Sequence, residues 1–89
     1  MTLEKDVEKA FNDRVKALGG MSEKFTSPNR RSVPDRLVTL PGGVMLFVEL
    51  KRPGAKPTEA QARDHARRRR LGCRVLVIDN VQDAKAFAG

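Results

Sequence analysis

The 89-residue sequence is poor in cysteine and aromatic residues and has no long apolar run. Its single cysteine, Cys73, excludes an internal disulfide and a zinc site built from cysteines. The longest apolar stretches, Val44–Val48 and Val75–Ile78, are far shorter than the roughly 20 residues that span a membrane. The first residues also lack the apolar segment of a secretory signal. We therefore expect a soluble protein of the cytoplasm that does not contact a membrane.

Acidic residues are also scarce relative to basic ones. The chain has 18 Lys and Arg against 11 Asp and Glu, a net charge of +7. The excess is concentrated in Arg63–Arg74, which holds six arginines and one acid. Such a field favours a polyanionic partner, usually a nucleic acid. With four phenylalanines and no tryptophan or tyrosine, phosphate contacts are favoured over stacking on bases.

The length is that of one domain, and we expect residues 1–89 to form it. An apolar fraction of 39% supports a small core. A chain of this size buries only about 60–65% of the surface that its unfolded form exposes. Burial by a second subunit therefore stays open.

The N-terminal half predicts one helix followed by strands. Apolar residues spaced three and four apart form the stripe of an amphipathic helix, namely Leu3, Val7, Phe11, Val15 and Leu18. Thr2 is the expected N-cap, and Gly19-Gly20 are expected to end the helix. A short strand over Met21–Thr26 and a basic loop over Ser27–Pro34 follow.

Two further strands are predicted on either side of a hairpin turn. The turn is Pro41-Gly42-Gly43, and the strands are Arg36–Leu40 and Val44–Leu50. The second strand is the most apolar segment of the chain, so we expect it in the centre of the sheet.

The C-terminal half predicts a helix, a strand and a short helix. Thr58 and Gln61 have the spacing of a capping box at the start of a helix that ends near Leu71. Cys73–Ile78 is a β-branched strand, and Asn80 caps the last helix. A strand that follows a helical crossover runs parallel to its neighbour. The order α-β-β-β-α-β-α thus predicts an α/β fold with a central mixed sheet flanked by helices.

The main chemical signal is Pro34-Asp35 followed, thirteen residues later, by Glu49-Leu50-Lys51. The hairpin brings the end of its second strand beside the start of its first, so Asp35 and Glu49 can meet. Two converging carboxylates form a site for a hard cation such as Mg²⁺. Lys51 shares a face with Glu49 and can hold water or developing negative charge. The Leu50 carbonyl and Glu8 are candidates for further oxygen ligands.

These residues, in this element order, resemble the PD-(D/E)xK nucleases with a restriction-endonuclease-like core. Within that superfamily the sequence is similar to the virus-type replication-repair nuclease (VRR-NUC) domain from about Glu4 to Asp79, in the stand-alone form that phages and bacteria encode. The segments that carry the resemblance are Lys24–Arg36, Leu40–Gly43, Phe47–Lys51, Thr58–His65 and Leu71-Gly72. Asn29 and Ser32 depart from the family pattern, since members commonly have glycine there.

The resemblance implies a metal-dependent DNA nuclease that uses Mg²⁺ or Mn²⁺. It places the family's site residues on Asp35, Glu49, Lys51, Gln61 and Glu8. Glu4, one turn before Glu8, stays open as the helix-one carboxylate. Stand-alone members are associated with homodimers that cut branched DNA such as four-way (Holliday) junctions. The resemblance therefore also implies a homodimer acting on DNA in a bacterial or phage-infected cell.

Several residues have a plainer alternative. Gln61 can be a helix cap alone. His65 lies one helical turn after Gln61, so it can face the same cleft as a ligand or an acid, but a lone helix histidine is more often a surface or packing residue. The residues we expect to contact DNA phosphates are Lys24, Arg30, Arg31, Arg36 and Arg67.

Two alternative functions also stay open at this point. The first is a DNA-binding module that keeps the fold and does not cut, although Asp35, Glu49 and Lys51 are all intact. The second is a nuclease that prefers flaps or single-stranded ends over junctions.

Overall fold

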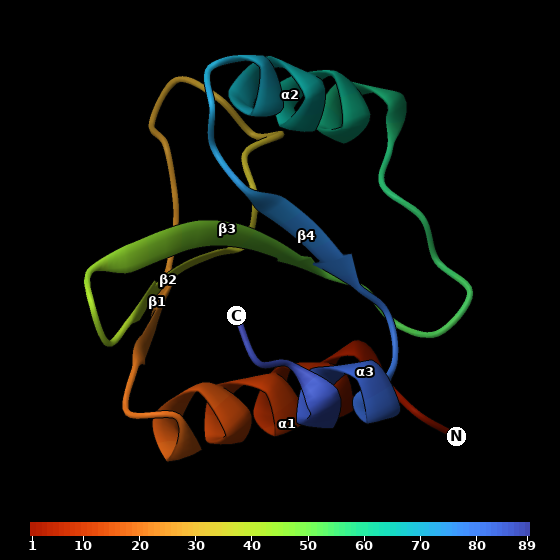
Figure 1. The fold of residues 1–89 in the computed structure, drawn as a ribbon. Helices are drawn as coiled ribbons and strands as arrows, with labels where there is room; N and C mark the ends of the chain where they lie inside the picture. Colours follow the sequence, from red (N-terminus) through yellow and green to blue (C-terminus); the bar gives the residue numbers. More distant parts are fainter.

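A four-stranded sheet with helices on both faces forms the frame of the molecule (Figure 1). The computed structural model describes residues 1–89. In chain order the elements are α1 (Glu4–Ala17), β1 (Met21–Lys24), β2 (Arg36–Leu40), β3 (Val44–Leu50), α2 (Glu59–Arg70), β4 (Val75–Ile78) and α3 (Val81–Ala86). The predicted α/β class and the predicted element order are confirmed. None of these helices has the length and apolar character needed to cross a membrane.

The strands lie in the order β1-β2-β3-β4, so the sheet is mixed. The first three strands pair antiparallel, and β4 runs parallel to β3 after the crossover through α2. In this register Val48 lies opposite Arg36, and Glu49 lies opposite Val77. The end of β3 therefore lies beside the start of β2, as the hairpin predicts.

The two faces of β3 have different neighbours because side chains alternate along a strand. Leu46, Val48 and Leu50 are buried against α1 and α3, which lie on one side of the sheet in Figure 1. There the rings of Phe11 and Phe87 pack with centroids 5.1 Å apart. Burying each large apolar side chain contributes about 1.5–3 kcal/mol, so this face supplies most of the stability.

The opposite face of β3 carries Met45, Phe47 and Glu49, and α2 lies on this side (Figure 1). Only its end nearest α2 is covered. Phe47 lies under the guanidinium of Arg68, 4.7 Å from the ring centroid, whereas Met45 is 55% exposed. On the face toward α2, the end of β3 with Glu49 is therefore polar and covered, and the end with Met45 is apolar and exposed.

Three predicted boundaries differ from the observed ones. The N-cap of α1 is Leu3 and not Thr2, because the carboxylate of Asp6 accepts a 2.7 Å hydrogen bond from the Leu3 N–H. β1 ends at Lys24 and not Thr26, because the chain turns at Ser27–Arg30, where the Arg30 N–H donates to the Ser27 carbonyl.

The third difference lies at the start of β4. This strand begins at Val75 and not Cys73, since the Cys73 N–H donates to the Arg68 carbonyl in the turn that closes α2. In each of the three cases the boundary differs from the predicted one by one or two residues.

The glycine pair after α1 acts in two ways. Gly19 has a φ of +82°, the left-handed conformation that ends a helix. Gly20 is needed for space, because a Cβ there would lie 2.6 Å from the carbonyl oxygen of Thr39. The close approach packs the turn after α1 against β2.

Candidate active site

Asp35 connects the start of β2 to the end of β3. Its Oδ2 accepts a 2.9 Å hydrogen bond from the Leu50 N–H, so a side chain takes the place of a strand partner. The N–H and carbonyl of one strand residue point toward the same neighbouring strand. The Leu50 carbonyl therefore faces the side on which Asp35 lies, as the predicted metal ligand must.

Glu49 projects from β3 toward α2 and is only 1% exposed. Its Oε2 accepts from Gln61 Nε2 at 3.3 Å and lies 3.5 Å from Lys51 Nζ. Burial, and after it the nearby Asp35 carboxyl, raises the pKa of Glu49 to about 8 against the opposing effect of Lys51. The carboxylate is therefore placed where a proton or a cation stabilises it.

Gln61 connects the capping of α2 with this carboxylate. Its Oε1 accepts from both the Thr58 N–H and Lys51 Nζ, each at 2.9 Å. The backbone N–H of Gln61 donates to Thr58 Oγ1. The sequence left two roles open for Gln61, a cap or a contact in the site. The structure gives the side chain both contacts at once.

His65 lies one turn beyond Gln61 and is 2% exposed. Its Nε2 faces Glu49 Oε1 at 3.5 Å, and neither atom has a hydrogen-bond partner. Burial, followed by the positive charge of Arg69, lowers the pKa of His65. The spacing of four residues from Gln61 was the one signal in the sequence for this neighbour of Glu49.

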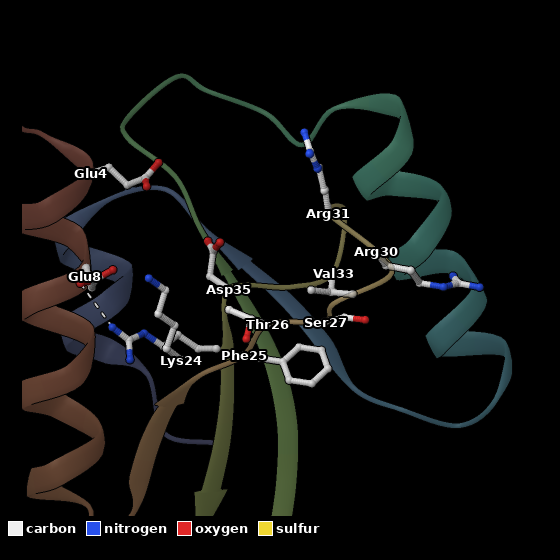
Figure 2. A pocket seen from close by; sticks show the side chains of 11 residues that line it. Glu4, Glu8, Lys24, Phe25, Thr26, Ser27, Arg30, Arg31, Val33 and Asp35 are labelled. Carbon is white, nitrogen blue, oxygen red and sulfur yellow. Dashed lines mark ion pairs between the residues drawn. The ribbon is translucent and has the colours of Figure 1, made fainter.

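A cleft of about 500 Å³ opens on the α1 side of Asp35. Figure 2 shows the Asp35 carboxylate pointing into it, with Glu4 on one side and Arg31 on the other. Lys24 reaches from β1 toward the space between Glu8 and Asp35. The charged residues that line the cleft are Lys24, Arg30, Arg31, Arg36, Glu4, Glu8 and Asp35. Four cations and three acids thus surround one opening.

Glu8 and Arg36, both predicted site residues, lie against each other. Glu8 Oε1 is 3.3 Å from Arg36 Nη2, and the Arg36 side chain is 14% exposed. The charge of Arg36 is thus directed toward α1. Glu4 and Glu8 both line the cleft, so the choice between them stays open.

Arg30 and Arg31 are neighbours in the basic loop, but their side chains diverge. Figure 2 shows Arg30 extending toward α2 and Arg31 extending away from it. Arg30 Nη1 lies 3.6 Å from Oδ1 of Asp64, which is buried on α2. Asp64 also accepts a 2.7 Å bond from Arg68 Nε. Arg31 has no such partner, and Arg67 is exposed on α2 outside the cleft. Sequence analysis did not identify the contact of Arg30 with Asp64.

No protein-family model matches the chain. A solved structure of a protein described as "VRR_NUC domain" superposes with a TM-score of 0.89 at 38% sequence identity, covering 97% of this chain and 94% of that one. The chain belongs to the VRR-NUC nuclease family. The "Putative nuclease p44" of Acyrthosiphon pisum secondary endosymbiont phage 1 is 52% identical over 77 residues, 86% of this chain and 83% of that protein. The resemblance read from the sequence, the fold class and the assignment as a nuclease enzyme are confirmed.

Nucleases of the VRR-NUC fold generally depend on divalent metal ions, and the residues present fit one. No three His, Cys, Asp or Glu side chains are gathered closely enough to hold an ion by themselves. Asp35, Glu49 and the Leu50 carbonyl offer hard oxygen ligands, and Mg²⁺ typically takes only one or two carboxylates with water and phosphate oxygens. Glu8 lies across the cleft, where it forms an ion pair with Arg36. Glu49 Oε1, buried without a hydrogen bond, has lone pairs left to accept a cation.

Proposed function

We propose that this VRR-NUC protein is a divalent-metal-dependent DNA endonuclease that hydrolyses phosphodiester bonds, selects branched DNA and works as a homodimer. The observation that carries the proposal is the buried Glu49 carboxylate beside Asp35, with Lys51 3.5 Å from it. Of these three groups Asp35 lines the cationic cleft, while Glu49 and Lys51 lie behind it. A carboxylate pair with an adjacent ammonium at the edge of such a cleft matches the charges of a phosphodiester in hydrolysis.

Asp35, Glu49 and the Leu50 carbonyl would hold Mg²⁺ or Mn²⁺. When bound, such an ion supplies charge stabilisation at the phosphate and makes water a nucleophile at neutral pH. The carboxylates hold their orientation through the protein itself, because Asp35 accepts from the Leu50 N–H and Glu49 accepts from Gln61. Little rearrangement is then needed on binding.

Lys51 stabilises negative charge that develops on the phosphate or orients the attacking water. Its ammonium is held in place by the 2.9 Å bond to Gln61 Oε1, which is fixed in turn by the Thr58 N–H. Positioned charges in a partly buried site stabilise a transition state more than mobile ones, because they need no reorganisation. Glu8 supports the site from the opposite wall of the cleft.

DNA would approach over the cationic rim of the cleft. Lys24 points into the opening and Arg31 stands at its side, so these two are the first candidates for phosphate contact (Figure 2). Arg36 and Arg30 carry their charge beside Glu8 and Asp64, so they contribute to the field more than to direct contacts. Arg67 extends the cationic surface along α2.

The homodimer is supported by the open part of the sheet. Met21 and Met45 are 58% and 55% exposed and lie on either side of Thr39 on one face. A second copy of the chain is the occupant that we propose for this surface. A two-fold dimer presents two active sites to the two strands of a symmetric junction. Its place of action would be the cytoplasm of a bacterial or phage-infected cell.

The test is cleavage of a labelled four-way junction beside matched linear duplex, flap and single strand, with Mg²⁺, Mn²⁺ or EDTA. Glu49→Ala is the control. We expect cutting that needs the metal and Glu49 and is concentrated on the junction. Preference for the flap or the single strand would replace the branched substrate, and binding without cutting in either metal would reduce the protein to a DNA-binding module.

A further inference from the structure

Two buried polar atoms from different elements face each other without a hydrogen bond. They are Oε1 of Glu49 on β3 and Nε2 of His65 on α2, 3.5 Å apart, in side chains that are 1% and 2% exposed. Buried polar side-chain atoms nearly always have a partner, and an unpaired one is costly. The 3.5 Å contact therefore joins two atoms that each lack a partner.

The other oxygen of the Glu49 carboxylate already has polar contacts. Oε2 already has Gln61 and Lys51 as polar neighbours, so Oε1 is the oxygen that no hydrogen-bond donor holds in place. Gln61 and His65 are four residues apart and therefore lie on the same face of α2. One helix face thus presents two nitrogen groups to the two oxygens of one carboxylate.

We propose that His65 is a positioning residue, whose Nε2–H holds Oε1 of Glu49 so that the carboxylate keeps the orientation in which it binds the metal ion. A shortening of about half an ångström brings the 3.5 Å contact to hydrogen-bond length. The inference rests on the proposed function, because it assumes that Glu49 is a metal ligand.

A competing role for His65 is direct ligation. Imidazole suits transition metals, whereas Mg²⁺ prefers oxygen. A ligating His65 would therefore matter for Mn²⁺ and have little effect on Mg²⁺. A positioning His65 acts on the carboxylate and affects both ions alike.

The experiment measures Mg²⁺ and Mn²⁺ binding to the metal-free protein by isothermal titration calorimetry, with the unfolding temperature of each variant alongside. The variants are His65→Leu, which has no donor; His65→Gln, whose amide reaches the place of Nε2; and His65→Asn, whose amide is one methylene shorter. We expect His65→Leu and His65→Asn to weaken both metals about 10–100-fold. His65→Gln should stay within a few-fold of the wild type.

Three results would overturn the inference. One is metal binding by His65→Leu that equals the wild type. Another is a loss confined to Mn²⁺, which would make His65 a ligand. The third is an equal loss of metal affinity in the Gln and Asn variants that parallels a drop in their unfolding temperatures, which would make His65 a packing residue. If His65→Leu does not fold, the Gln and Asn pair makes the same comparison. A wild-type protein that binds neither metal would instead refute the proposed metal site.

Discussion

The two sides of β3 show how one strand combines an apolar core with a buried carboxylate. On the side of α1 and α3, Val48 and Leu50 are packed in a core of apolar side chains. On the side of α2, the neighbouring Glu49 is just as deeply buried, but its contacts are Gln61, Lys51 and His65. At this end of β3 the side chains on both faces are equally buried. The two faces differ in what surrounds those side chains, which is apolar packing on one and polar partners on the other.

This difference separates the two tasks in energetic terms. The face toward α1 gains free energy from each buried apolar side chain, while the face toward α2 spends some of it to keep Glu49 in a low-dielectric environment. Changes on the α1 side should thus alter the free energy of unfolding, and changes on the α2 side should alter cleavage.

The largest effect is expected on the α1 face. Phe11→Ala removes a fully buried ring in contact with Phe87 and should destabilise the protein by about 3–5 kcal/mol. Denaturant unfolding followed by circular dichroism measures this. The fraction that stays folded should cleave at a normal rate, and a selective loss of cleavage in folded protein would contradict the separation of the two faces.

On the α2 face, Lys51→Ala should lower the cleavage rate about 10²–10³-fold while the protein stays folded and binds DNA. Lys51 is partly exposed, and its ammonium contacts only Gln61 and Glu49, so little packing is lost. Single-turnover cleavage and a DNA-binding titration measure the two quantities. Near-normal cutting would remove Lys51 from the mechanism.

The carboxylates of α1 provide a sharper comparison across the cleft. Glu8→Gln should lower cleavage about tenfold or more, as the loss of a group that supports a metal site does. Glu4→Gln is the matched control on the same wall of the cleft. Full activity in Glu8→Gln together with a loss in Glu4→Gln would assign the role to Glu4.

The raised pKa of Glu49 gives a pH dependence that the apolar face lacks. Between the ordinary pKa near 4.5 and about 8, the folded metal-free protein keeps a proton that the unfolded chain has released. Its stability should therefore fall as pH rises through this range. The same proton competes with a cation, so metal affinity should rise up to about tenfold per pH unit below 8.

Calorimetric titration with Mg²⁺ at pH 6.5, 7.5 and 8.5, with thermal unfolding at the same values, checks both trends. Glu49→Gln cannot titrate, and its unfolding temperature should lose this component of the pH dependence. A wild-type metal affinity that does not change with pH would show that Glu49 is ionised before the metal binds.

The smallest effect is expected at the basic loop. Arg31→Ala should weaken DNA binding modestly and reduce the slope of log affinity against log salt by about 0.9, the share of one phosphate on duplex DNA. Arg30→Ala should reduce the slope less, because Arg30 already has Asp64 as a partner. Binding measured over a range of salt concentrations separates the two, and equal slopes for both variants would contradict the divergence of their side chains.

Elements whose signals are local could be predicted from the sequence. The strands at Arg36–Leu40 and Val44–Leu50 and the caps at Thr58 and Asn80 depend on neighbours within a few residues, and the structure has them as predicted. The meeting of Asp35 with the end of β3 followed from the hairpin alone.

The surroundings of Glu49 could not be predicted in the same way. α2 has almost no apolar residues, so no hydrophobic stripe indicated which side faces the sheet. The burial of His65 and the contact of Asp64 with Arg30 depend on how α2 docks, which is a tertiary property. A motif in the sequence identified Asp35, Glu49 and Lys51. Their hydrogen-bond partners could be determined only from the folded structure.

The double engagement of Gln61 has a consequence for the dynamics of the protein. Its Oε1 accepts hydrogen bonds from the Thr58 N–H at the start of α2 and from the ammonium of Lys51, while its Nε2 donates to Glu49. Fraying of that single turn would release all three at once, so opening of the helix end and loss of the site form one cooperative unit. Amide exchange at Gln61 would then report directly on the fraction of molecules whose site is assembled.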